Sequence, residues 1–330
     1  MEHSENNEIS FGSRIPLTEL KEQIEAIKAE LHKVIVGQEE LIELLLVALI
    51  SNGHVLIEGV PGLAKTLTAK LLAKTVQTDF SRIQFTPDLM PSDILGTSIF
   101  NNQTNSFEFK QGPIFSNFIL IDEINRAPAK TQAALFEVME ERQITIDGNT
   151  YEMKPPFLVL ATQNPIEQEG TYALPEAQLD RFLMKITIDY PTLEQEIQLL
   201  QLEQTNENAV KTDLLKPVIT ATQLVDFQKL ALKVMIEPQL LQFIAQIVNN
   251  TRNHNFLYLG ASPRASIAIL VASKSYALIN GRDFVTPDDI KHVAYYVLNH
   301  RLILAPEREM EGITIKDVVK QIIDTVEIPR

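Results

Sequence analysis

The chain has 330 residues, a formal net charge of −14, 45% hydrophobic and 22% charged residues, and no cysteine. This length predicts about two domains with cores of their own, and the hydrophobic fraction excludes a disordered chain. The lack of cysteine excludes disulfide scaffolds and thiolate metal sites, and it fits a cytoplasmic protein. The negative charge, without clusters of Lys and Arg, argues against stable nucleic-acid binding.

The first 16 residues are polar and acidic, so we expect a flexible tail rather than a secretory signal. Helical spacing of apolar residues begins at Leu17, and a second, well-buried helix is expected over residues 41–50. The longest purely apolar run is the seven residues 44–50. A bilayer requires roughly 20 such residues, so no direct membrane insertion is expected.

Short apolar strands then alternate with helical segments, as in a parallel sheet covered on both faces. We expect strands at 54–58, 82–85, 118–121, 157–161 and 184–188, and hairpins over 101–109 and around 147–149. After Pro191 the pattern predicts only helices, over about 193–204, 221–231, 237–250, 263–280, 287–299 and 314–326. The sequence therefore predicts a tail (1–16), an α/β nucleotide-binding core (17–191) and a helical domain (192–330).

Residues 58–66, EGVPGLAKT, lie between an expected strand and an expected helix. This is the context of a phosphate loop, in which glycines let backbone N–H groups turn toward a phosphate. Lys65 would reach the β- and γ-phosphates, and the Thr66 hydroxyl would bind Mg²⁺. Ala64 stands where the strict pattern G-x-x-x-x-G-K-[ST] has glycine, so the motif is a near match. The alternative is a glycine-rich turn with an exposed lysine.

Two carboxylates, Asp122 and Glu123, follow the apolar run FILI. A phosphate loop needs an aspartate at the end of a second strand to hold Mg²⁺, and Asp122 fits that role. The adjacent Glu123 can polarise a water, which suits hydrolysis better than transfer to another acceptor. The alternative is that both side chains cap the helix that follows.

Three further polar side chains are candidates for the site. Asn164 follows a strand, where it would orient a water or touch the γ-phosphate, or it belongs to an ordinary Asn-Pro turn. Arg181 either neutralises charge on a transferring phosphoryl group or pairs with Asp180 at the surface. Arg264 lies in the first turn of a helix capped by Ser262, where a cation opposes the helix dipole. Arg264 therefore faces an anion, which is either a phosphate or a nearby carboxylate.

Together these motifs resemble the MoxR family of AAA+ ATPases, from about residue 34 to residue 329. The resemblance is carried by VGQE (36–39), GVPGLAKT (59–66), DEINR (122–126), ATQNP (161–165), LPEAQLDRF (174–182), GASPR (260–264) and GRDFVTPDD (281–289). It implies an α/β P-loop NTPase fold of the AAA+ type, with a parallel-sheet core and a C-terminal all-helical lid domain. Ala64 looks like a normal variant within this family.

The resemblance also implies a role for each matching residue. Walker A, which would bind ATP, would comprise Gly59, Val60, Pro61, Gly62, Leu63, Ala64, Lys65 and Thr66. Walker B would comprise Asp122 and Glu123, with Mg²⁺ held by Thr66 and Asp122. The remaining positions would be sensor 1 at Asn164, the arginine finger at Arg181, sensor 2 at Arg264 and the adenine contact at Val36 and Gly37.

The function implied by the resemblance is a Mg²⁺-dependent ATPase that forms a hexameric ring and remodels or matures a partner complex, in the manner of a chaperone. The usual partners carry von Willebrand factor A domains, so a partner would be a separate chain. Residues 88–109 would be the insertion in helix 2 that this clade often places toward a central pore. We expect Arg181 to act across a subunit boundary, which would make hydrolysis depend on assembly.

Three other functions stay open: a metal-chelatase-like motor subunit, a DNA-associated AAA+ motor and a nucleotide switch that does not hydrolyse. The acidic charge argues against the DNA motor. Glu123 argues against the switch, because a switch needs no residue that activates water.

Overall fold

The computed structural model describes residues 17–60, 62–164, 172–205 and 211–327, so the expected tail and Pro61 lie outside the described residues. Five parallel strands form its central sheet: β1 (Val55–Glu58), β2 (Phe80–Gln84), β5 (Phe118–Asp122), β8 (Leu158–Gln163) and β9 (Met184–Thr187). They are arranged in the order β2-β5-β8-β1-β9, with β1 between β8 and β9. All five predicted strands are confirmed, each shifted by at most two residues.

The two faces of the sheet form two separate hydrophobic cores. Successive side chains of a strand point to opposite faces. Phe118 and Leu120 of β5 therefore lie in one core, and Ile119 and Ile121 lie in the other. The first core contains α1 (Leu17–Leu31), α2 (Glu39–Ile50) and α3 (Lys65–Thr75), and the second contains α5 (Ala129–Glu141). Burial on both faces explains why the central strands β5 and β8 begin as continuous apolar runs.

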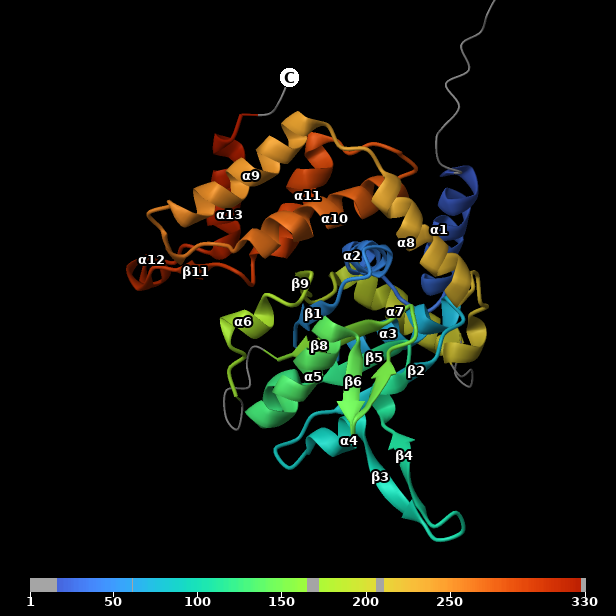
Figure 1. The fold of residues 1–330 in the computed structure, drawn as a ribbon. Coiled ribbons are helices and arrows are strands. Elements are labelled where there is room, and N and C mark those ends of the chain that lie inside the picture. The colour runs from blue at the N-terminus through green and yellow to red at the C-terminus, as the bar shows by residue number, and fades with distance from the viewer. Residues whose placement is uncertain (1–16, 61, 165–171, 206–210, 328–330) are drawn as a thin grey trace, which may run out of the picture.

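A layer of helices covers α2 on the side away from the sheet (Figure 1). Its members are α8 (Ala221–Lys233), α9 (Pro238–Arg252), α10 (Pro263–Ile279), α11 (Pro287–Leu298), α12 (Pro306–Met310) and α13 (Ile315–Thr325), and α7 (Leu193–Thr205) leads into it. Capping boxes begin α8 at Thr220, α11 at Thr286 and α13 at Thr314. These caps satisfy backbone N–H groups that the first helical turn leaves free. The six predicted helices are confirmed, and their ends move by at most two residues.

A short antiparallel ladder contradicts the prediction that only helices follow Pro191. It pairs β10 (Leu257–Leu259) with β11 (Ile303–Leu304), two segments that precede α10 and follow α11. Segments of three and two residues are too short to give a strand signal in sequence. Their pairing depends on the two helices that bring them together.

Two hairpins interrupt the α/β alternation, as predicted. β6 (Gln143–Ile146) and β7 (Asn149–Glu152) are joined at Asp147 and Gly148, which both have positive φ, as a two-residue hairpin turn requires. β3 (Gly96–Asn101) and β4 (Ser106–Gln111) form a longer hairpin that projects away from the sheet (Figure 1). The remaining elements are α4 (Pro91–Leu95), α6 (Glu176–Leu179) and short 3₁₀ turns at Pro113–Phe115, Ile124–Arg126 and Lys211–Leu214. None of the helices described is long and apolar enough to cross a bilayer.

His54, at the entry to β1, is a buried neutral side chain. Its Nδ1 accepts a hydrogen bond from the backbone N–H of Val159 at 3.0 Å, so the ring proton is on Nε2, which donates to the carbonyl of Met139 at 3.1 Å. Burial, aided by the nearby charge of Arg142, lowers the pKa of His54 to about 3. The unfolded chain therefore binds this proton more readily than the native one does.

Stability should consequently fall as the pH drops through the ordinary histidine pKa of about 6.5. Between pH 7 and pH 5, the burial of His54 alone should lower the free energy of unfolding by about 2 kcal/mol. Urea unfolding of the parent and of His54→Gln at both pH values measures this, and the variant should lose that share of the pH dependence. His32→Gln, at a partly exposed position, controls for the loss of a histidine as such. Equal pH dependence in the parent and His54→Gln would contradict the assignment.

Candidate functional site

The loop between β1 and α3 has the backbone shape that its glycines predict. Gly62 has a φ of 91°, and a Cβ there would meet nothing within 4 Å, so conformation rather than space favours glycine. Ala64 has a φ of 56° at the N-terminus of α3. This is the position where the strict pattern has glycine, because a left-handed conformation costs an L-residue roughly 1–2 kcal/mol. Ala64 thus adopts the left-handed conformation that glycine would adopt without strain.

Lys65 begins α3 and folds back over the loop. Its Nζ donates to the carbonyl of Gly59 at 2.5 Å. Burial lowers the pKa of Lys65, and the carboxylates of Asp122, Glu123 and Glu58 partly oppose that effect. A cation so placed, at the entrance of a helix, suits an anionic ligand.

A cavity of about 400 Å³ brings together most of the predicted residues. Its lining includes Lys65 and Thr66 from the loop, Asp122 and Glu123 from the end of β5, and Asn164 after β8. These residues meet because the carboxyl ends of parallel strands share one edge of the sheet. Motifs that lie far apart in the sequence therefore line one pocket.

The two carboxylates of the pocket are held by different partners. Asp122 is 7% exposed, and it accepts hydrogen bonds from Arg82 Nε at 2.6 Å and from Thr162 Oγ1 at 3.2 Å. Glu123 Oε2 accepts from Gln84 Nε2 at 2.8 Å and lies 3.0 Å from Arg126 Nε. The Glu123 side chain makes no capping hydrogen bond to the turn that follows it.

Arg82, Gln84 and Thr162 were not identified from the sequence. Arg82 and Gln84 alternate with the buried Ile83 on β2, so they share the face that turns toward Asp122 and Glu123. The alternation of these two polar residues with the buried Ile83 is the signal that could have identified them. The neighbour relation of β2 and β5 is not visible in sequence.

The donor set of this pocket suits Mg²⁺ bound together with phosphate. A hydroxyl and a carboxylate are the hard oxygen ligands that Mg²⁺ prefers, and Mg²⁺ commonly takes one or two carboxylates plus substrate phosphates. Asp122 already faces a cation, the guanidinium of Arg82. No cluster of three or more metal-binding side chains exists among the described residues, so other ligands would come from phosphate or water.

Val36 and Gly37 lie at a separate cavity of about 560 Å³, between the loop before α2 and helix α7. Gly37 has a φ of 65°, and a Cβ there would lie 2.5 Å from Gln195 Nε2. Gln38 connects this region to the phosphate loop, because its Nε2 donates to the carbonyl of Leu63 at 3.0 Å. This hydrogen bond connects the segment that lines one cavity with the loop that lines the other.

Arg181 and Arg264 lie together, outside the lining of the pocket that holds Lys65. Arg181 Nη1 donates to the carbonyl of Phe136 at 2.7 Å and lies 3.8 Å from Glu140 Oε2. Arg264 Nη2 donates to Glu140 Oε1 at 2.9 Å. The anion facing Arg264 within this chain is thus a carboxylate, the second of the two predicted possibilities.

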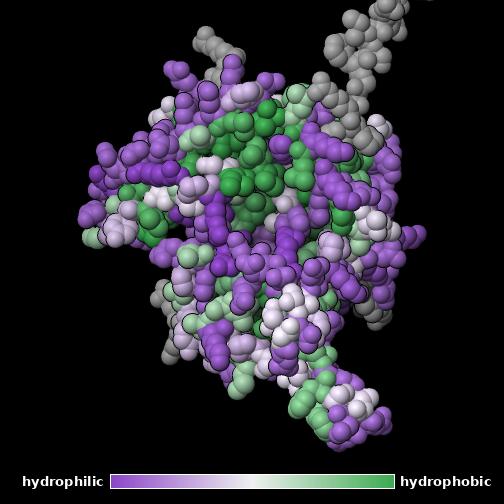
Figure 2. Space-filling model, viewed as in Figure 1, coloured by the Kyte–Doolittle hydropathy of each residue, from purple (hydrophilic) through white to green (hydrophobic). Residues whose placement is uncertain are grey.

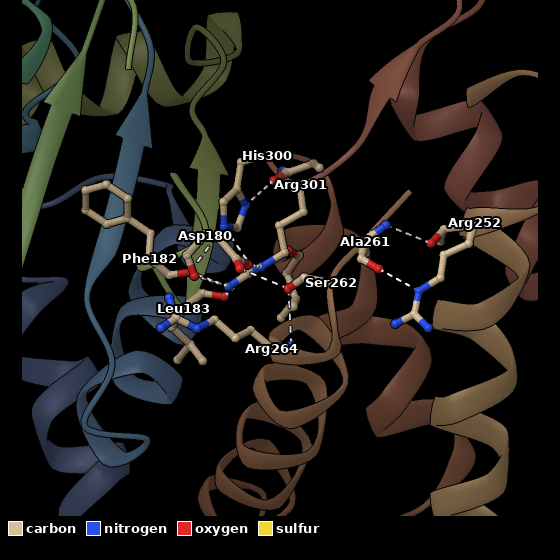
Figure 3. A network of polar contacts seen from close by, with 12 residues as sticks. Asp180, Phe182, Leu183, Arg252, Ala261, Ser262, Arg264, His300 and Arg301 are labelled. Atoms are coloured by element: carbon tan, nitrogen blue, oxygen red, sulfur yellow. Dashed lines mark hydrogen bonds and ion pairs between the residues drawn. The ribbon is translucent and has the colours of Figure 1, made fainter. Parts of the chain in front are cut away.

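Asp180 does not pair with Arg181, which was the other interpretation of that arginine. Its carboxylate accepts from Arg301 Nε at 2.7 Å and from Ser262 Oγ at 2.9 Å (Figure 3). Ser262 also accepts from the N–H of Arg264 at 3.2 Å, which confirms the predicted N-cap.

Comparison with known proteins relates most of the chain to ATPases. A family model for "ATPase family associated with various cellular activities (AAA)" matches residues 54–184, and an AAA lid domain model matches residues 249–322. The uncharacterised protein YeaC of Bacillus subtilis is 46% identical over 91% of this chain and 92% of its own length. Chaperone MoxR1 of Mycobacterium tuberculosis is 44% identical over 91% of this chain and 81% of its own length. A crystal structure of an ATPase candidate from Cytophaga hutchinsonii, 45% identical, superposes with a TM-score of 0.88 and covers 94% of this chain and 96% of that one.

Proposed function

Because this chain belongs to the MoxR family of AAA+ ATPases, we propose that its ATP hydrolysis drives the chaperone-like remodelling or maturation of a partner protein complex. The chain is an ATP-hydrolysing enzyme with a P-loop NTPase core and a helical lid. The observation that carries the proposal is the single pocket that gathers Lys65, Asp122 and Glu123. The relative named as a chaperone supports the remodelling role.

Within this pocket we assign each residue by its position. Lys65 and the loop N–H groups bind the phosphates of ATP, and Thr66 and Asp122 hold Mg²⁺. When bound, Mg²⁺ neutralises charge on the phosphates. Glu123 orients and polarises the attacking water, and its bonds to Gln84 and Arg126 hold the carboxylate in place. Asn164 stands at the neighbouring strand end as sensor 1.

Two substitutions separate nucleotide binding from chemistry. Lys65→Ala removes the charge facing the phosphates and should weaken ATP binding at least tenfold. Glu123→Gln retains the ligands of nucleotide and Mg²⁺, so ATP affinity should stay near that of the parent while turnover falls about 100-fold or more. Fluorescent-nucleotide titration and steady-state phosphate release measure the two effects. An equal loss of affinity in both variants would refute these roles.

The placement of the two arginines supports action across a subunit boundary. Glu140 holds both in the single chain, away from the nucleotide pocket of that chain. We assign Arg181 as the arginine finger and Arg264 as sensor 2 of a neighbouring nucleotide, whose γ-phosphate replaces Glu140 as their anionic partner. Such an arrangement requires like subunits that meet head to tail, and we propose that they close into a hexameric ring.

Mixing two weakly active variants tests this arrangement. Arg181→Ala lacks the finger and Glu123→Gln lacks water activation, so each alone should lose roughly 10³-fold in rate. In mixed rings, an intact Glu123 meets an intact Arg181 at some interfaces, and ATPase activity should rise above the sum of the separate variants. Subunit exchange is verified with two affinity tags. If exchange occurs without a rise in activity, Arg181 does not act across the boundary.

The projecting β3–β4 hairpin is our candidate for contact with the remodelled protein. Phe100 and Phe107 at its outer part are 49% and 73% exposed, and their rings pack on one another. Figure 2 shows apolar side chains mixed with polar ones on this projection. We propose that the hairpin faces the centre of the ring and that the partner carries a von Willebrand factor A domain.

The ATP-bound assembly should retain that partner. Tagged Glu123→Gln, which binds but does not hydrolyse ATP, should copurify with a von Willebrand factor A domain protein in the presence of ATP. Lys65→Ala should not, because it fails to reach the bound state. Proteomic comparison of the two preparations measures the difference. Equal recovery from both variants, or recovery of tetrapyrrole-pathway proteins instead, would contradict the partner class.

A further inference from the structure

A buried arginine from the helical layer clamps the segment that carries Arg181. Arg301 follows α11 and is 8% exposed. Its Nε donates to Asp180 Oδ1 at 2.7 Å and its Nη2 to the carbonyl of Phe182 at 2.7 Å. Its Nη1 donates to the carbonyl of Leu183 at 3.2 Å (Figure 3). The guanidinium therefore holds the chain immediately before and immediately after Arg181.

The same network reaches Arg264. Asp180 accepts from Ser262 Oγ at 2.9 Å, and Ser262 caps the helix whose first turn carries Arg264. One carboxylate thus connects the residue before Arg181 with the cap of α10. Arg181 and Arg264 are also connected through Glu140, because both form an ion pair with its carboxylate.

The burial of Arg301 favours a role in fixing geometry over a role in stability alone. Desolvation lowers the pKa of Arg301, although the hydrogen bond that Arg301 donates to Asp180 opposes the effect. Removing a charge from water costs free energy, and a fold with an apolar pair in place of a buried ion pair is often at least as stable. His300 stays neutral because burial holds its pKa well below 6.5, so its Nε2 can accept from Arg301 Nη1 at 2.9 Å. A fully bonded polar network of this kind specifies one arrangement.

We propose that Arg301, acting through Asp180, is a positioning residue that holds Arg181 and Arg264 as one rigid pair for the nucleotide of the neighbouring subunit. The inference rests on the proposed action of these arginines across a subunit boundary. In this proposal, the contacts between the helical layer and the segment before β9 determine whether Arg181 and Arg264 can act on the neighbouring nucleotide. Arg301 itself touches neither its own nucleotide pocket nor Glu140 among the contacts that the structure describes.

Two variants test the clamp from its two ends. Arg301→Lys keeps the charge but loses the fork that reaches Asp180, Phe182 and Leu183 at once. Asp180→Asn keeps the shape but loses the ion pair. Each should lower kcat roughly 100-fold, the effect expected when a catalytic group is displaced by about 1 Å. The affinity for ATP should stay within about twofold of the parent, because Lys65 and Thr66 are untouched. Thermal unfolding identifies any variant that fails to fold, in which case the other carries the test.

Mixed assemblies distinguish this role from a general structural one. Arg301→Lys retains a functional nucleotide pocket, so mixing it with Lys65→Ala, which retains its arginines, should restore activity. Mixing it with Arg181→Ala should restore none, because both variants fail on the same side of the interface. Arg282→Lys is the matched control: it alters another lid ion pair, with Asp289, that has no contact with Asp180, and it should keep the parent kcat.

The outcomes separate the clamp from the proposal on which it depends. If Arg181→Ala mixed with Lys65→Ala gains activity but Arg301→Lys mixed with Lys65→Ala does not, the clamp is wrong and the trans action stands. A gain between Arg301→Lys and Arg181→Ala, or ATP affinity that falls in step with kcat, likewise overturns the clamp. If no mixture gains activity despite verified exchange, the trans action itself fails and the clamp fails with it.

Discussion

The burial of helix α2 is the constraint on which the rest of the structure depends. Nine of its twelve residues are buried, and it contacts β9 on one side and α8 and α10 on the other. Burying a leucine or isoleucine side chain stabilises the fold by roughly 1.5–3 kcal/mol. Separating the helical layer from the sheet would expose several such side chains at once. One continuous core therefore runs from the sheet through α2 into the helical layer, and it fixes the junction where Arg301 meets Asp180.

Much of the fold and of the nucleotide pocket could be predicted from the sequence, because both follow from local sequence patterns. The apolar runs of β5 and β8 predict buried parallel strands, and parallel strands end at one edge. Asp122, Glu123 and Asn164 could therefore be placed near Lys65 from the sequence alone. The helix start at Ser262 could likewise be predicted, since a cap and the proline after it are neighbours in the chain.

Contacts between segments that lie far apart in the chain could not be predicted from the sequence. Arg82 meets Asp122 only because β2 and β5 are adjacent in the sheet. Arg301 and Asp180 are 121 positions apart, and Arg264 and Glu140 are 124 apart. No periodicity or cap connects such pairs, and the net charge of a segment does not reveal the partner of each arginine. The arrangement of Arg181 and Arg264 on one carboxylate is for that reason a finding of the structure.

Ala64 has a consequence for the conformation of the phosphate loop. A glycine at this position would adopt a positive φ without strain, whereas an alanine disfavours the left-handed conformation that Ala64 has here. The left-handed turn is held by the surrounding structure, which includes the helix that it opens and the bond from Gln38 to Leu63. Without those contacts, residue 64 would relax toward negative φ, and the backbone N–H groups of the loop would turn with it. The shape of the anion site therefore depends on the packing of α3 and on Gln38, a dependence that glycine at position 64 would weaken.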